Sequence, residues 1–160
     1  MNEMKTVSNF TIAELSEGQS FSFDTTISEA MIDAFAMLTG DVSPLHIDHR
    51  FATGRGFKGR VVHGALLCGL VSRLIGVHLP GRDCLLHSIN MKYPMPTYAN
   101  DLVRTKGAIE QISFATRAMT LQVEITNVNS QCIVAKGKVT VGFTEETGSV
   151  TINDLITDPS

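Results

Sequence analysis

An apolar segment at residues 64–76, GALLCGLVSRLIG, constrains the fold most, because it is apolar nearly all round. Such a pattern is typical of a helix that is enclosed by other structure rather than of one that lies on a surface. Four strand-like segments follow it, at residues 85–93, 101–112, 116–127 and 132–144. We therefore expect an α+β fold in which one curved, meandering antiparallel sheet wraps around a long central helix.

Two further elements are expected before this helix. Residues 19–27 alternate around two phenylalanines, which predicts a half-buried strand. Ser28 is a suitable N-cap for an amphipathic helix that ends at Gly40. Residues 44–60 are polar and glycine-rich, which indicates an irregular loop with a turn of helix near residues 49–52.

The length of 160 residues suits a single domain. We place this domain at residues 17–144, between an N-terminal extension at residues 1–16 and an acidic tail at residues 145–160. The first sixteen residues lack the long apolar core of a signal peptide. Residues 61–79 approach the length of a membrane span, but a histidine, an arginine and three glycines interrupt them. No membrane insertion is expected.

The charge balance argues against nucleic acid as a partner. The formal net charge is -3, and the chain has no basic run. A neutral or mildly anionic small molecule is the expected ligand. The three cysteines, Cys68, Cys84 and Cys132, are odd in number and widely spaced, so they predict neither a disulfide framework nor a zinc knuckle. This usage favours a reducing, cytoplasmic setting.

The segment Asp41-Val42-Ser43-Pro44-Leu45-His46 joins a carboxylate and an imidazole across a proline. The two groups are five positions apart, whereas neighbours on one helix face are three or four apart. Pro44 fixes its own φ and disfavours a helical Ser43, so the chain must bend between Asp41 and His46. A bend of this kind can direct both side chains into one cleft, which suggests acid–base chemistry.

Simpler interpretations compete with this one. Asp41 alone is compatible with a turn after the preceding glycine, and His46 alone with a structural or surface role. His46, Asp48, His49 and His63 include metal-ligand types, but their spacing matches no ligand signature, so we expect no metal. A glycine pattern at residues 54–59 has no preceding strand, and we therefore expect no dinucleotide cofactor there.

Three motifs in this order and spacing resemble the MaoC-like, hydratase-2 group of (R)-specific enoyl-CoA hydratases. The motifs are TGDVSPLHID at residues 39–48, VVHGALL at residues 61–67 and LPG at residues 79–81, and the resemblance runs from about residue 17 to residue 143. It implies a hot-dog fold, an acyl-CoA thioester substrate, and a homodimer or higher homo-oligomer with active sites near the interface between subunits.

The resemblance also implies roles for individual residues. Asp41 and His46 match the acid–base pair of the family, and the backbone N–H of Gly64 matches the group that meets the thioester oxygen. Helix N-termini present unpaired amides, which suits such an oxyanion role. Ser72 aligns with a serine that lies near the pair in relatives. Ser43 departs from the asparagine usual in the family, so the loop geometry or the substrate range is expected to differ.

The implied reaction is hydration of a trans-2-enoyl-CoA to an (R)-3-hydroxyacyl-CoA, or the reverse dehydration, with no cofactor and no metal. One alternative is an acyl-carrier-protein dehydratase or a thioesterase on the same fold. Those relatives commonly carry an acidic residue on the central helix, and none occurs at residues 61–77. Another alternative is a noncatalytic subunit that binds acyl thioesters without turnover.

Overall fold

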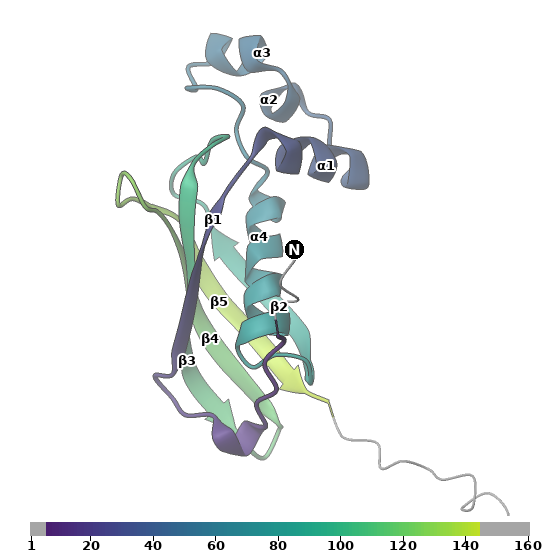
Figure 1. Ribbon diagram of the computed structural model, residues 1–160, viewed down its shortest axis with the longest axis vertical. Helices are drawn as coiled ribbons and strands as arrows, with labels where there is room; N and C mark the ends of the chain where they lie inside the picture. Colours follow the sequence, from purple (N-terminus) through teal and green to yellow (C-terminus); the bar gives the residue numbers. More distant parts are fainter. Residues whose placement is uncertain (1–5, 145–160) are drawn as a thin grey trace, which may run out of the picture.

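A curved antiparallel sheet lies against one long helix in the computed structural model, which describes residues 6–144 (Figure 1). The strands are β1 (Ser20–Thr26), β2 (Cys84–Lys92), β3 (Leu102–Ser113), β4 (Ala118–Asn127) and β5 (Ile133–Phe143). The helix is α4 (Gly64–Arg73), which continues into the π-helical segment η2 (Leu74–His78). The expected α+β architecture, a sheet wrapped around a central helix, is confirmed.

The strand order is β1-β3-β4-β5-β2, and all neighbours are antiparallel. The last three strands form the expected meander. The expectation fails for β2, which pairs with β5 rather than with β3, the next strand along the chain. The connection from β2 to β3 therefore crosses from one side of the sheet to the other, and β1 and β2 are the two edge strands.

The core lies between α4 and the sheet. It contains the helix residues Leu66, Leu67, Leu70, Val71 and Leu74, and the strand residues Val103, Leu121, Ile125, Val139 and Val141. The sequence pattern predicts a helix enclosed on all sides, but one face of it is open in the single chain. The exposed residues are Ala65, Gly69, Ser72 and Gly76. Their small or absent side chains give the face little apolar area to bury.

Three further helices lie at one end of the sheet, near the start of α4 (Figure 1). They are α1 (Glu29–Thr39), α2 (Pro44–Ile47) and α3 (His49–Gly54). Ser28 caps α1 as expected, since its Oγ accepts a hydrogen bond from the Met31 N–H at 3.2 Å. Gly40 ends α1 with a φ of 77°, a left-handed conformation that favours glycine.

The segment expected to be an irregular loop with one helical turn contains two short helices instead. Pro44 is the first residue of α2, a position where its missing N–H is not needed. Asp48 caps α3, because its Oδ1 accepts from the Phe51 N–H at 3.0 Å. The helix-start residues Pro44 and Asp48 therefore determine the local structure of this segment more than its polar composition does.

The residues before β1 include a short 3-10 helix, η1 (Ile12–Glu14), and they reach the far end of the central helix. The Ser8 N–H donates to the Val77 carbonyl at 2.8 Å, and the Phe10 N–H to the Pro80 carbonyl at 3.2 Å. The domain boundary after residue 16 stays a prediction, and the acidic tail at residues 145–160 lies outside the described residues. Within residues 6–144, no helix has the length and apolarity needed to cross a membrane.

Candidate active site

Asp41 and His46 lie close together, on either side of the bend at Pro44. Asp41, His46 and His63 each place a carboxylate oxygen or a ring nitrogen within 4.8 Å of the others. The Asp41 carboxylate also accepts a hydrogen bond from the Ser43 N–H at 3.3 Å, which holds the turn. The side chain of Asp41 is 52 % exposed, so it is accessible to a ligand. The structure thus brings together the two side chains that the sequence pairs.

The imidazole of His46 is oriented by the chain just before α4. Its Nδ1 lies 2.7 Å from the Val61 carbonyl oxygen, and the Val61 N–H donates to the Leu45 carbonyl at 3.1 Å. Because a carbonyl oxygen only accepts hydrogen bonds, Nδ1 carries the hydrogen in the neutral ring. The Nε2 of His46 is then the nitrogen with a free lone pair, and it is the atom that can take up a proton.

His63 connects both members of the pair and is only 2 % exposed. Its Nε2 lies 3.0 Å from the backbone carbonyl oxygen of Asp41, so Nε2 carries a hydrogen and donates it. The His63 ring also stacks on the His46 ring, with centroids 3.9 Å apart. Its Nδ1 is buried and has no hydrogen-bond partner among the described residues. His63 therefore fixes the backbone of Asp41 and the ring plane of His46 together.

Gly64, the first residue of α4, follows His63 directly. The His63 side chain accepts no hydrogen bond from the amides of α4, so it does not cap the helix start. Uncapped amides at a helix N-terminus stabilise a negative charge that lies next to them. Ser43 occupies the N-cap position of α2, also without a side-chain cap, and it contacts the site through its backbone N–H.

Ser72 lies apart from the pair. It is eight residues beyond Gly64 on α4, which is about 12 Å along the helix axis at the usual rise per residue. Its side chain is on the open face of the helix. The single chain therefore does not bring Ser72 to Asp41 and His46, and its supporting role stays a prediction.

Asp41, His46 and His63 are of the residue types that bind transition metals. The Nε2 of His63 is already committed to the Asp41 carbonyl, and a metal ligand must offer a lone pair there. The geometry suits proton transfer better than metal binding.

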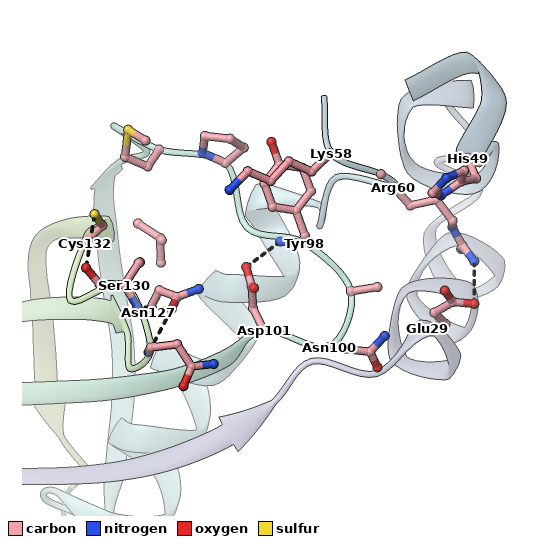
Figure 2. A pocket seen from close by; sticks show the side chains of 16 residues that line it. Glu29, His49, Lys58, Arg60, Tyr98, Asn100, Asp101, Asn127, Ser130 and Cys132 are labelled. Carbon is pink, nitrogen blue, oxygen red and sulfur yellow. Dashed lines mark hydrogen bonds and ion pairs between the residues drawn. The ribbon is translucent and has the colours of Figure 1, made fainter. Parts of the chain in front are cut away.

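A cavity of about 560 Å³ lies beside this group, between α1, residues 58–60, residues 95–101 and the turn from β4 to β5 (Figure 2). Arg60 lines it, and the Arg60 Nε donates to the His46 carbonyl at 2.6 Å. The guanidinium of Arg60 pairs with Asp33 and with Glu29. Arg60 thus ties α1 to α2 and fixes the backbone of His46. Asp41, His46 and Gly64 do not line this cavity.

Three contributors to the site lie beyond what the sequence alone indicates. They are the stacking of His63 on His46, the link from Arg60 to the His46 backbone, and the ring of Tyr93, which covers Gly64. His63 is marked in the sequence by its place in the motif at residues 61–67, directly before Gly64, but the motif does not indicate its contact with His46. Neither Arg60 nor Tyr93 belongs to a motif that marks a site, since both act through contacts that form only in the folded chain.

A curved sheet around a central helix, with Asp41, His46 and His63 grouped at the start of that helix, is the architecture of the hot-dog class. The profile of the family described as "MaoC like domain" matches residues 12–131. The chain belongs to this MaoC-like family. The named relatives are hydro-lyases, and the chain is an enzyme of this type.

Named relatives support the same placement. The chain is 30% identical over 128 residues to an (R)-specific enoyl-CoA hydratase of Rhodospirillum rubrum, covering 80% of this chain and 88% of the relative. The solved (R)-hydratase of Aeromonas caviae superposes with a TM-score of 0.77 at 28% identity, covering 81% of this chain and 97% of that chain. R-hydratase PhaJ1 of Pseudomonas aeruginosa superposes with a TM-score of 0.81 at 26% identity, covering 88% and 89%. The expected hot-dog fold is confirmed.

Proposed function

We propose that this protein hydrates trans-2-enoyl-CoA thioesters to (R)-3-hydroxyacyl-CoA thioesters and catalyses the reverse dehydration. The observation that carries the proposal is the convergence of Asp41, His46 and His63 within 4.8 Å, next to the first amide of α4. The (R)-hydratases among the relatives support the substrate class and the stereochemistry. The three cysteines are free thiols, which supports the reducing, cytoplasmic setting expected from the sequence.

The pair supplies the two proton transfers of hydration. One member takes a proton from water as the water oxygen bonds to C3 of the enoyl group. The π electrons move towards the thioester oxygen, and the other member donates a proton to C2. One proton enters the pair and one leaves it, so the pair returns to its starting state once a proton passes between Asp41 and His46. Their separation of at most 4.8 Å permits this transfer, directly or through one water.

The amide of Gly64 supplies the electrostatic part of the reaction. Negative charge develops on the thioester oxygen in the transition state, and a preorganised N–H donor at a helix N-terminus stabilises it. Gly64 has no side chain, and the Tyr93 ring lies against it at the place where a side chain would begin. His63, which precedes Gly64, holds Asp41 and His46 in register with this amide.

A spectrophotometric assay with crotonyl-CoA tests the proposal. We expect loss of the enoyl absorbance on addition of the wild-type protein. The product is expected to be oxidised by an (R)-specific 3-hydroxyacyl-CoA dehydrogenase and not by an (S)-specific one. Parallel assays measure release of free thiol, which reports hydrolysis, and turnover of the same acyl group on acyl-carrier protein.

Each of the other outcomes of these assays indicates a different activity or a different stereochemistry. An (S) product contradicts the proposed stereochemistry. Free thiol without loss of the double bond indicates a thioesterase, and faster turnover on acyl-carrier protein indicates a dehydratase of that pathway. Binding of crotonyl-CoA without any turnover indicates a noncatalytic acyl-thioester subunit.

We infer that the working form is a homodimer joined through β2. This strand is an edge of the sheet, and Leu85 on it is 59 % exposed. An uncovered edge strand with apolar side chains is a template for pairing with another chain. Met37 and Leu38, close in sequence to Asp41, are also 86 % and 84 % exposed, as expected for residues that a second copy covers.

Leu85→Lys is expected to shift the protein from dimer to monomer, because a lysine on an edge strand opposes strand pairing. Sedimentation equilibrium of both proteins measures the shift. Phe114→Lys is the matched control, since Phe114 is similarly exposed but lies in the turn between the inner strands β3 and β4 and not on an edge strand. A monomeric wild type, or equal dissociation of both variants, contradicts pairing through β2.

A further inference from the structure

Tyr93 lies directly after β2, and its ring covers the start of α4. A Cβ added to Gly64 would lie 3.2, 3.3 and 3.4 Å from the Cζ, Cε1 and Cε2 atoms of Tyr93. The hydroxyl end of the ring therefore lies against the flank of Gly64, at contact distance from the position that a Cβ would take. The ring is thus a neighbour of the amide to which the thioester oxygen is assigned.

A second contact fixes the ring in this place. The Tyr93 hydroxyl lies 2.9 Å from the Cys68 Sγ. Cys68 is four residues after Gly64, so both contacts of Tyr93 are on one face of the first turns of α4. Burial and the hydrogen bond to Cys68 both raise the pKa of the Tyr93 phenol above its ordinary value. The ring stays uncharged at neutral pH and adds no negative charge beside a developing enolate.

Tyr93 is still 44 % exposed, although it packs on the helix. The ring contacts Gly64 and Cys68, and the rest of the side chain is exposed in the single chain. An aromatic ring with one anchored side and one open side is suited to form a wall of a binding slot. None of the proton transfers assigned to Asp41 and His46 involves this ring.

We propose that Tyr93 is a specificity-determining residue whose ring forms the wall of the acyl-thioester slot beside Gly64 and excludes substrates with a substituent on C2. This inference rests on the proposed function. With the thioester oxygen on the Gly64 amide, C1 is bonded to that oxygen and C2 is the next carbon. The proposal places C2 on the Tyr93 side of C1 and the sulfur on the opposite side. A hydrogen on C2 then fits beside the ring, whereas a methyl group on C2 meets it.

The test compares kcat/KM for crotonyl-CoA and for its 2-methyl derivative, trans-2-methyl-2-butenoyl-CoA. The wild type is expected to prefer the unbranched substrate. Tyr93→Ala is expected to raise the branched-to-unbranched ratio at least about tenfold, the discrimination that one methyl group commonly provides. Tyr93→Phe keeps the ring, and its ratio is expected to stay within about twofold of the wild type, as it does for the control Met95→Ala. Met95 is exposed, two residues further on, and lines the separate cavity.

A ratio does not change when part of a variant is misfolded, so it separates selectivity from stability. Tyr93→Val, which also lacks the ring, gives a second measurement if the alanine variant does not fold. An unchanged ratio in the ring-less variants overturns the inference, and so does a tenfold rise in Tyr93→Phe, because the hydroxyl rather than the ring would then select.

Failure of the proposed function is visible separately, as absence of crotonyl-CoA hydration by the wild type. In that case the same comparison is made by calorimetry with the saturated ligands butyryl-CoA and 2-methylbutyryl-CoA. The quantity compared is the Kd of 2-methylbutyryl-CoA divided by the Kd of butyryl-CoA. A fall of at least about tenfold in this ratio in Tyr93→Ala still supports the inference that the Tyr93 ring excludes a C2 substituent. Equal ratios in the wild type and Tyr93→Ala contradict it.

Discussion

Asp41→Asn is expected to lower kcat for crotonyl-CoA hydration by about 10²–10⁴-fold, the range typical of losing one acid–base group. Asparagine has the shape of aspartate, and its side-chain oxygen still accepts the hydrogen bond that the Ser43 N–H donates to Asp41. The substitution removes the negative charge and the ability to take up a proton. The fold is expected to remain, because Asp41 is an exposed residue with local hydrogen bonds. Steady-state kcat and KM, with a thermal unfolding curve, measure both effects.

Asp48→Asn is the matched control for this variant. Asp48 is a carboxylate of the same segment, and its Oδ1 caps α3 by accepting from the Phe51 N–H. Asparagine caps helices about as well as aspartate, so the control is expected to retain kcat within about twofold. Turnover of Asp41→Asn near the wild-type rate contradicts the role of Asp41. Equal losses in both variants point to general damage of the segment.

The layered fold could be predicted from the sequence because its signals are local. The apolar pattern of residues 64–76 and the alternation of the later strands each arise within one element. The place of β2 beside β5 could not be predicted in this way, because alternation shows which face of a strand is buried but not which strand lies next to it. The open face of α4 was also missed, since glycine and alanine count as apolar although they bury little area.

The same difference between local signals and contacts of distant residues applies to the site. Asp41 and His46 could be paired from the sequence, because the bend at Pro44 depends on neighbouring residues. The stack of His63 on His46 joins residues 17 positions apart, and the cover of Tyr93 over Gly64 joins residues 29 positions apart. Such contacts depend on how β2, α2 and α4 pack. The sequence therefore predicts the proximity of Asp41 and His46 better than the contacts of the groups that hold and border them.

His46→Gln is expected to lower kcat by about 10²–10⁴-fold, with a smaller change in KM. The amide of glutamine reaches towards the position of the imidazole Nε2, but it cannot accept and return a proton. His46→Asn places an amide near the position of Nδ1, where it can still donate to the Val61 carbonyl. If proton transfer at Nε2 is the role of His46, both variants lose turnover. If His46 only anchors residue 61, the asparagine variant retains turnover.

Two further measurements sharpen the role of His46. His49→Gln is the control, since His49 is an exposed histidine three residues further along the same segment, and its kcat is expected to change by less than about twofold. The double variant Asp41→Asn with His46→Gln is expected to be scarcely slower than either single variant, because groups that act as one unit give non-additive losses. Losses that multiply in the double variant indicate that Asp41 and His46 act independently, and a single proton-sharing pair at the start of α4 is then the wrong description of this site.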